Sequence, residues 1–288
     1  MAVTHKQLRA FHHVARQGGF SRAAVELGLT QPAISEQVRR LEMSRDVLLF
    51  ERRGKAVILT QAGEALYAMT KRYFAVEAEI DAYFTDRADA LSGRLRLVAD
   101  AAQHVADRIT RFRARYPGLR IEIQSGNTAT VLARLRSYDA DIGVIGAAPA
   151  EPDLLTQDLG SSPIIAFGLR KSLPSQPERI PLAALAKHPW VMREQGSETR
   201  ALVERAAAER GLSPDIAIEV EGREALRAMV LSGGGIGFIS AAEYSPDPAL
   251  RAIDIADLTI AMPEALVCLA VRRDVRAIRT FMSGALEA

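Results

Sequence analysis

The 288-residue sequence predicts a helical headpiece of the winged helix-turn-helix type, a long linker helix, and an α/β region of two lobes. Three observations predict this fold class. Two short helix patterns meet at Gly28 and Leu29, and a proline-free apolar repeat fills residues 61–90. From residue 93 onward strand and helix patterns alternate, which is typical of Rossmann-like α/β subdomains.

The first helix of the pair is expected to begin at Ser21, a residue type that accepts hydrogen bonds from free backbone N–H groups at a helix start. Its inward positions would be Ala23, Ala24 and Leu27. Gly28 supplies the left-handed conformation that ends a helix, so the turn is predicted to be tight.

The second helix is expected to be capped by Thr30, with Pro32 in its first turn, where a missing N–H costs nothing. Ile34, Val38 and Leu41 follow at spacings of four and three, which places them on the inner face. The outer face is left to polar side chains that can bond base edges or phosphate oxygens in the major groove of DNA: Gln31, Ser35, Gln37 and Arg39. The alternative is an ordinary helical hairpin with a solvated polar face.

Residues 50–60 predict a small β-wing after this helix pair, because an apolar alternation follows a turn at Gly54. The wing would hold Arg52, Arg53 and Lys55 near phosphates. Residues 1–60 contain ten Lys and Arg against five Asp and Glu, whereas the remaining 228 residues contain 27 against 30. A basic headpiece suits sequence-independent attraction to phosphate, although five extra charges are equally compatible with a role in solubility.

The segments LRAFHHVARQGGFSRAAVELGLTQPAISEQVRRLE and LFERRGKAVILTQAG resemble the N-terminal domain of LysR-type transcriptional regulators. The resemblance implies double-stranded promoter DNA as a partner and assigns DNA contacts to Gln31, Pro32, Ser35, Arg39, Arg52 and Arg53, beside which we count Thr30, Gln37 and Lys55. It also implies a dimer that often pairs into a tetramer, and an effector domain similar to periplasmic solute-binding proteins. The sequence departs from the family pattern in two places, at Glu36 and at residues 45–46. Glu36 places a negative charge on the reading face, and Asp46 stands where a helix-ending glycine is usual, with Arg45 in place of an apolar residue.

Residues 61–90 predict one long helix, whose apolar positions recur at spacings of three and four: Leu66, Met69, Tyr73, Val76, Ile80 and Tyr83. A rod of about 45 Å needs a partner for such a stripe. We expect a homodimer that brings two recognition helices to a two-fold-related site, with packing inside one chain as the alternative. The predicted domains are therefore 1–60, 61–90 and 91–288, with a hinge at 91–93.

The third domain begins with strand and helix patterns in the order βαβαβ, which predicts a parallel sheet with ligands at the carboxyl ends of its strands. A similar order repeats from residue 163. We expect lobe I to span about 93–162 and 265–288, and lobe II about 163–264; the return of the last strand and helix to lobe I is implied by the family resemblance.

Three strand-to-helix junctions between the lobes carry small or hydroxyl residues at a helix start, a pattern that binds anions when the N–H groups are free. The alternative for Ser197, Thr199 and Thr128 is plain N-capping. The expected effector-binding residues are Asp100, Ala101, Gln103, Asn127, Thr128, Arg193, Glu194, Ser197, Thr199, Arg200, Glu221 and Arg223.

Within this domain MREQGSETR, EGREALRAMV and GGGIGFISAAE resemble the LysR subgroup associated with 2-aminoethylphosphonate catabolism. Such a ligand would place its anion at the helix starts and its ammonium near Asp100, Glu194 or Glu221. Closure of the cleft is expected to alter the angle between linked headpieces and so the DNA bend or the contact with RNA polymerase.

Other function classes find little support in the sequence. We find no nucleophile–base set, cofactor loop or metal motif, so no enzyme, cofactor or metal site is expected. The glycine run at 232–237 precedes a strand and so predicts a turn instead of a nucleotide loop. The single Cys268 lies in a buried strand pattern, and without an export signal or a membrane span we expect a cytoplasmic protein. A constitutive architectural DNA binder without an effector is the main alternative.

Overall fold

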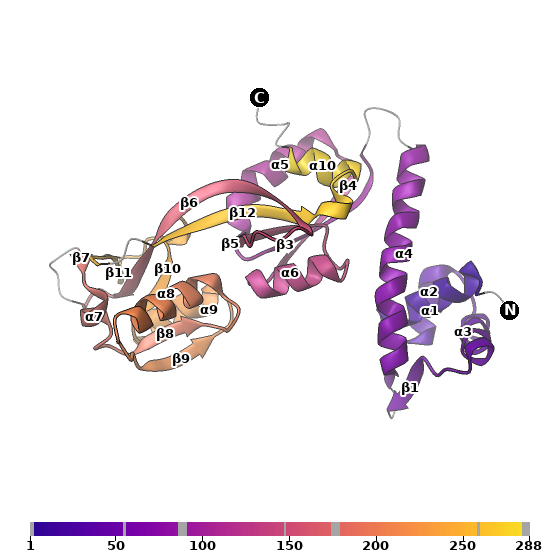
Figure 1. Ribbon diagram of the computed structural model, residues 1–288, viewed down its shortest axis with the longest axis horizontal. Coiled ribbons are helices and arrows are strands. Elements are labelled where there is room, and N and C mark those ends of the chain that lie inside the picture. Colours follow the sequence, from indigo (N-terminus) through magenta and orange to yellow (C-terminus); the bar gives the residue numbers. More distant parts are fainter. Residues whose placement is uncertain are drawn as a thin grey trace. The chain divides into compact units, whose positions relative to one another are not determined.

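The computed structural model describes residues 3–53, 56–85, 91–146, 148–173, 179–257 and 260–283 (Figure 1). The chain divides into two compact units, Met1–Arg87 and Ala88–Ala288, which we describe separately as the headpiece and the α/β unit. In the described residues, no helix is both long enough and apolar enough to cross a membrane.

The headpiece is built from three short helices, a hairpin and one long helix: α1 (His5–Gln17), α2 (Phe20–Leu27), α3 (Gln31–Arg45), β1 (Phe50–Arg53), β2 (Ala56–Leu59) and α4 (Gln61–Thr85). Thr4 and Gln7 form a reciprocal capping box at the start of α1. The core is closed by Phe11 and Val14 of α1 and by the inner face of α3, where Ile34, Val38 and Leu41 are buried as predicted.

The predicted cap at Ser21 is wrong. Helix α2 begins at Phe20 with Gly19 as its N-cap, so Ser21 lies in the first turn and its hydroxyl donates to Gln31 Oε1 at 3.3 Å. The earlier start fits the packing of Phe20, whose ring lies 5.7 Å from that of Phe50 in the headpiece core. Burial of this ring outweighs the local capping preference of serine.

The other signals of the helix pair are confirmed. Gly28 ends α2 in the left-handed conformation with φ 65°, and Thr30 caps α3 by accepting a hydrogen bond from the Ala33 N–H. Asp46 ends α3 in the same left-handed region at φ 51°, which supports its substitution for the usual glycine.

The α/β unit begins with the predicted parallel order. Lobe I contains β3 (Gly93–Ala99), a 3-10 turn η1 (Ala102–Val105), α5 (Ala106–Arg115), β4 (Leu119–Ser125), α6 (Thr128–Arg136), β5 (Ile142–Gly146), a 3-10 turn η3 (Ala270–Arg272) and α10 (Arg276–Met282). Strand β3 is parallel to both β4 and β5. Lobe II contains β7 (Arg179–Ile180), α7 (Leu182–Leu185), β8 (Trp190–Arg193), α8 (Glu198–Glu209), β9 (Ile216–Val220), α9 (Arg223–Leu231), β10 (Gly237–Ser240), a 3-10 turn η2 (Ala241–Glu243) and β11 (Leu250–Ile255).

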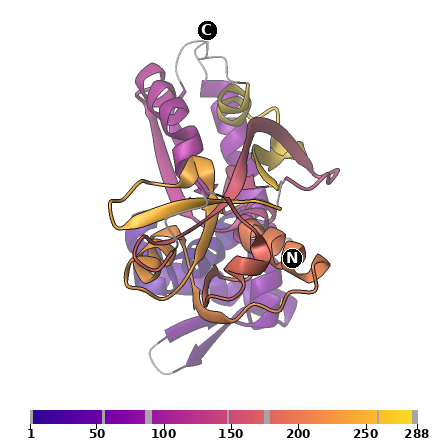
Figure 2. The same cartoon turned by 90° about the vertical axis from the view of Figure 1, so that its left-hand side faces the viewer.

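Two long strands, β6 (Leu154–Leu169) and β12 (Ala261–Leu269), run through both lobes and were not predicted at this length. They join the lobes in one sheet of order β4-β3-β5-β12-β6-β11-β7, with β10 also paired to β6; β8 and β9 form a separate pair. The crossing can be followed in Figure 1 and, turned by 90°, in Figure 2. The predicted lobe boundaries at 162/163 and 264/265 therefore fall inside continuous strands.

Each lobe has its own buried core. Trp190 is fully buried in lobe II, and its indole N–H donates to the Leu185 carbonyl oxygen at 3.0 Å. Cys268 is fully buried in β12, where burial raises the pKa of its thiol to about 11.

The glycine run at 232–237 forms the predicted turn after α9. At Gly235, with φ 140°, an added Cβ would lie 2.1 Å from the Pro189 carbonyl oxygen.

His12 couples α1 to α4 inside the headpiece. Its ring packs against Tyr67 and Phe74, and its Nδ1 lies 3.1 Å from Thr70 Oγ1. Because the Thr70 hydroxyl donates to the Tyr67 carbonyl oxygen, His12 Nδ1 must be the donor of this hydrogen bond. Burial, aided by nearby His13, Arg16 and Lys71, lowers the pKa of His12 from 6.5 to about 4.

This lowered pKa predicts acid sensitivity of the headpiece. Between about pH 6.5 and 4 the unfolded chain binds more protons at His12 than the folded chain does. The contribution of neutral His12 to the free energy of unfolding is therefore complete above pH 6.5 and decreases as the pH falls. We expect a loss of about 2 kcal/mol between pH 8 and pH 5. Urea unfolding followed by far-UV circular dichroism would measure it, while Trp190 fluorescence reports on the α/β unit alone. His12→Gln should flatten the dependence and His13→Gln should retain it; an equal slope in both variants would contradict the assignment.

Candidate functional site

The outward face of α3 carries the predicted reading residues. Gln31, Pro32 and Arg39 are exposed, and Ser35 and Gln37 are half-buried. Thr30 differs from them because its hydroxyl is occupied as the helix cap. The helix therefore presents amide, hydroxyl and guanidinium groups, which are the groups that bond base edges and phosphates in a major groove.

Glu36 is clamped on this face by two arginines. Its carboxylate accepts from Arg39 Nε at 2.9 Å and from Arg40 Nε at 2.7 Å. The hydrogen bonds from Arg39 and Arg40 lower the pKa of Glu36 to about 2, so this side chain is ionised at neutral pH. The predicted phosphate contact at Arg39 thus competes with an intramolecular partner one helical turn away.

The wing is an antiparallel hairpin in which Arg52 pairs with Val57 and Arg53 pairs with Ala56. The structure describes these arginines only as backbone positions of β1. The predicted contact at Lys55 falls outside the described residues.

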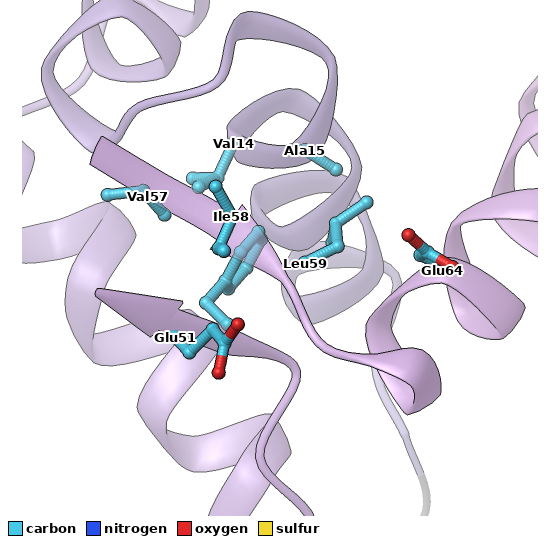
Figure 3. Close-up of a pocket in the computed structure, with 8 residues that line it drawn as sticks. Val14, Ala15, Glu51, Val57, Ile58, Leu59 and Glu64 are labelled. Atoms are coloured by element: carbon cyan, nitrogen blue, oxygen red, sulfur yellow. The ribbon is translucent and has the colours of Figure 1, made fainter. Parts of the chain in front are cut away.

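A hollow of about 440 Å³ lies behind the wing, where Val14 and Ala15 of α1 face Val57, Ile58 and Leu59 (Figure 3). Glu51 of β1 and Glu64 of α4 also line this hollow.

Four of the predicted seam residues of α4 are exposed: Met69 at 63%, Tyr73 at 45%, Val76 at 51% and Ile80 at 52%. Leu66 instead packs on the headpiece core, and the side chain of Tyr83 lies outside the described residues. An apolar row on one helix face is typical of a surface that is covered by another protein segment.

The α/β unit contains a cavity of about 420 Å³ between its lobes. It is lined by the ends of β3, β4 and β8 and by the starts of α6 and α9. The predicted residues that line it are Asp100, Ala101, Gln103, Asn127, Arg193, Glu194, Glu221 and Arg223. Gln124, Ser125, Arg134 and Glu224 also line it and were not among the expected effector-binding residues, although Ser125 and Glu224 belong to the candidate strand-to-helix junctions.

Asp100 joins the lobes at the floor of this cavity. Its Oδ1 lies 3.3 Å from Arg193 Nη2 and 3.1 Å from Arg223 Nη1, and its side chain is only 3% exposed. Arg193 also bonds Glu194, and Arg223 also bonds Glu243 through two nitrogens. Each guanidinium therefore contacts two carboxylates of this chain.

Glu194 occupies the anion position at the start of α9. Its carboxylate accepts from the Gly222 N–H at 3.1 Å, from Asn127 Nδ2 at 3.0 Å and from Arg193. Although burial raises the pKa of a carboxyl, the hydrogen bonds from Arg193 and Asn127 bring the pKa of Glu194 down to about 2. An ionised carboxylate of this chain thus occupies the start of α9, whereas the sequence predicted a ligand anion at the starts of α6 and α8.

Four predicted effector residues do not line the cavity. Thr128 is buried and donates to the Gly146 carbonyl oxygen, and the N-cap of α6 is Asn127. Ser197 and Thr199 are buried at the start of α8, and Arg200 bonds Glu204, Glu219 and the Arg193 carbonyl oxygen. The hydroxyl residues at these two junctions do mark helix starts. Their side chains, however, point into the lobes and not into the cavity. Arg200 holds the backbone of Arg193 in place through its hydrogen bond to the Arg193 carbonyl oxygen.

A second polar cluster lies where the lobes join. His104 of η1 lies 3.5 Å from Glu243 of η2 and 3.7 Å from Glu264 of β12. The Glu243 carboxylate raises the pKa of His104, and burial together with the charge of Glu243 raises the pKa of Glu264 to about 7. These residues are far apart in the chain, and their spacing carries no motif.

Two family models match the chain. The model described as "Bacterial regulatory helix-turn-helix protein, lysR family" matches residues 5–64, and the "LysR substrate binding domain" matches residues 88–288. The HTH-type transcriptional activator CmpR of Synechocystis is 31% identical over 83% of this chain and 79% of its own length. The RuBisCO operon transcriptional regulator of Allochromatium vinosum is 32% identical over 83% and 80%.

Solved structures show the same fold at lower identity. Full-length OxyR from Pseudomonas aeruginosa superposes with a TM-score of 0.75 at 21% identity, covering 99% of this chain and 96% of that one. Full-length CbnR in complex with its target DNA superposes with a TM-score of 0.68 at 19% identity, covering 98% and 100%.

The Glu36 clamp predicts a gain of DNA affinity on its removal. Glu36→Gln should release Arg39 and Arg40, and the slope of log K against log salt should steepen by about 0.9 for each guanidinium that gains a phosphate. Fluorescence anisotropy with a nonspecific duplex at several salt concentrations measures this slope. Glu79→Gln on α4 is the charge-matched control and should leave the slope unchanged. The same slope in Glu36→Gln and wild type would contradict the clamp.

Proposed function

Since the chain belongs to the LysR family of DNA-binding transcriptional regulators, we propose that it controls a promoter in response to a small anionic metabolite bound between its lobes. The observation that carries the proposal is the cavity whose anion position is held by Glu194. An effector anion would take over the hydrogen bonds from Gly222, Asn127 and Arg193.

We assign the DNA contacts to Gln31, Pro32, Ser35, Gln37 and Arg39 of α3, with Thr30 at its start, and to Arg52, Arg53 and Lys55 of the wing. The exposure of the polar side chains on α3 supports the assignment. The α3 residues would read bases and the wing would contact phosphates, so substitutions at Ser35 would relax base preference, whereas those at Arg53 would weaken binding to every sequence.

Two classes of target gene follow from different observations. Relatives named as regulators of RuBisCO operons favour genes of carbon fixation, and hence a phosphorylated metabolite as effector. The segments that resemble the 2-aminoethylphosphonate subgroup favour a zwitterionic phosphonate, whose ammonium would find Asp100, Glu194 and Glu221 on the cavity wall. Both ligands carry a phosphorus oxyanion, which is the shared chemistry that we propose.

A constitutive DNA binder is the second candidate, and one observation favours it. Asp100, Arg193 and Arg223 already link the lobes through ion pairs within the chain. Lobes closed in this way would need no effector to hold one arrangement.

Glu194→Gln tests the effector proposal, because it removes the charge that competes with a ligand anion. Isothermal titration calorimetry with the wild-type chain should detect binding of at least one of four compounds: 2-aminoethylphosphonate, ethylphosphonate, ribose 5-phosphate and inorganic phosphate. Its affinity should increase about tenfold in the variant, since a charge-assisted hydrogen bond is worth about 1.5–3 kcal/mol. Glu224→Gln removes the same charge from the same cavity wall and should leave affinity near that of wild type.

The outcomes separate the two candidates. If no ligand of the panel binds and none raises the melting temperature, the constitutive binder is favoured. Stronger binding of 2-aminoethylphosphonate than of ethylphosphonate would support the phosphonate effector, and the reverse would reject a role for the ammonium.

We propose that the apolar row on α4 pairs two chains into the homodimer, from which a homotetramer can assemble. Val76→Asp together with Ile80→Asp should place charges in this contact, and sedimentation velocity should then give the 31.3 kDa monomer. Ala68→Asp together with Ala78→Asp adds the same charges to exposed positions on other faces of the helix and should leave the dimer intact. Dimers that persist in the first variant would place the interface elsewhere.

A further inference from the structure

His104, Glu243 and Glu264 bring one imidazole and two carboxylates together at the junction of the lobes. One ligand atom from each lies within 4.8 Å of the other two. The measured separations are 3.5 Å from His104 Nε2 to Glu243 Oε1 and 3.7 Å to Glu264 Oε1. Both exceed a hydrogen-bond distance for an imidazole and a carboxylate.

Glu264 is the unusual member of this cluster. It is 3% exposed, and among the described residues neither of its carboxylate oxygens has a hydrogen-bond partner. The pairing of β12 with β6 shifts register between Glu264 and Ala265, and such a bulge re-aims a side chain relative to the regular pleat. A buried, ionised carboxylate without donors carries a large desolvation cost, which either protonation or a cation beside it relieves.

The surrounding charges leave a deficit of cations. Asp100, Glu194, Glu243 and Glu264 supply four carboxylates to the connected network, whereas Arg193 and Arg223 supply two guanidiniums. These charges sum to −2 when all four carboxylates are ionised and His104 is neutral, which is the protonation state in which the three side chains can act as metal ligands. One divalent ion would balance them.

We propose that His104, Glu243 and Glu264 form a binding site for a divalent transition-metal ion of the Zn²⁺ type. Ligand atoms around tetrahedral Zn²⁺, at bond lengths of about 2.1 Å, lie about 3.4 Å apart, close to the 3.5 and 3.7 Å that separate His104 Nε2 from the two carboxylates. Three protein ligands leave the fourth position to water. The imidazole favours Zn²⁺ and its neighbours over Mg²⁺ and Ca²⁺, which prefer oxygen ligands.

The ion would connect three chain segments that belong to different parts of the α/β unit. His104 follows β3 in lobe I, Glu243 follows β10 in lobe II, and Glu264 lies on β12 where this strand passes between them. Glu243 also accepts two hydrogen bonds from Arg223, which lines the effector cavity. Metal binding would thus fix the lobes at their junction and orient one wall of the cavity.

The test uses the full-length chain at pH 7.5, treated with a chelator and then dialysed against ZnCl₂. We expect about one Zn²⁺ per chain in wild type and in His188→Asn, which removes another partly buried histidine from the same unit. Glu264→Gln and His104→Asn should each weaken Zn²⁺ binding at least tenfold. In wild type, Co²⁺ should give the intense visible absorption of a tetrahedral site.

Glu264→Gln keeps the proposal falsifiable if His104→Asn does not fold, because glutamine has nearly the same shape and removes an unpaired buried charge. Circular dichroism should show that this variant is folded. The proposal is overturned if wild type binds no Zn²⁺, if Glu264→Gln binds it as wild type does, or if Mg²⁺ competes on equal terms. Loss of Zn²⁺ in His188→Asn alone would place the ion at His188 and would also overturn the proposal.

Discussion

The ion pairs of Asp100 with Arg193 and Arg223 are the contacts on which the arrangement of the α/β unit depends. A carboxylate at the end of a lobe I strand is held by two guanidiniums of lobe II, and its side chain is almost fully buried. Removing one partner of a buried ion pair leaves an uncompensated charge, which is far more costly than the pair is stabilising. Any ligand of this cavity must therefore supply replacement contacts before the lobes can rearrange, and the relative position of the lobes is governed by electrostatics as well as by packing.

The two continuous strands set the mechanical limits of that rearrangement. Because β6 and β12 belong to the sheets of both lobes, the lobes cannot separate without breaking ladder hydrogen bonds. Bending at the irregularity beside Glu264, where register already shifts, disturbs fewer of them. A lobe movement that bends the strands at this irregularity would therefore displace the segments beside His104 and Glu243.

Local signals in the sequence predicted much of this fold. Caps such as Thr30, the left-handed positions at Gly28 and Asp46, and the parallel order of β3, β4 and β5 depend on neighbours in the chain, so they could be read directly. The length of β6 could not be predicted in this way, because it is fixed by pairing with β12, about a hundred residues later in the chain. The start of α2 was missed for the same reason, since Phe20 packs against Phe50.

In the candidate sites, too, some features could be predicted from the order of the chain and others depend on tertiary contacts. Strand ends of a parallel sheet meet at one edge, so Asp100 and Asn127 could be placed together from their order alone. Arg193 ends β8 in a separate sheet, and its place opposite them was implied by the family resemblance. The direction of each side chain could not be predicted from the sequence. In the structure, Ser197 and Arg200 face the lobe interior. The grouping of His104 with Glu243 and Glu264 depends entirely on tertiary contacts.

Cys268 makes this chain convenient for spectroscopy. As the single thiol of the sequence, fully buried and with its pKa raised to about 11, it is almost entirely protonated at neutral pH and slow to react with maleimides or iodoacetamide. One cysteine introduced on the surface of lobe I could therefore be labelled alone. Trp190, the single indole, lies in the core of lobe II and would serve as the energy-transfer donor. The wild-type sequence thus provides a ready background in which lobe movement becomes a measurable distance.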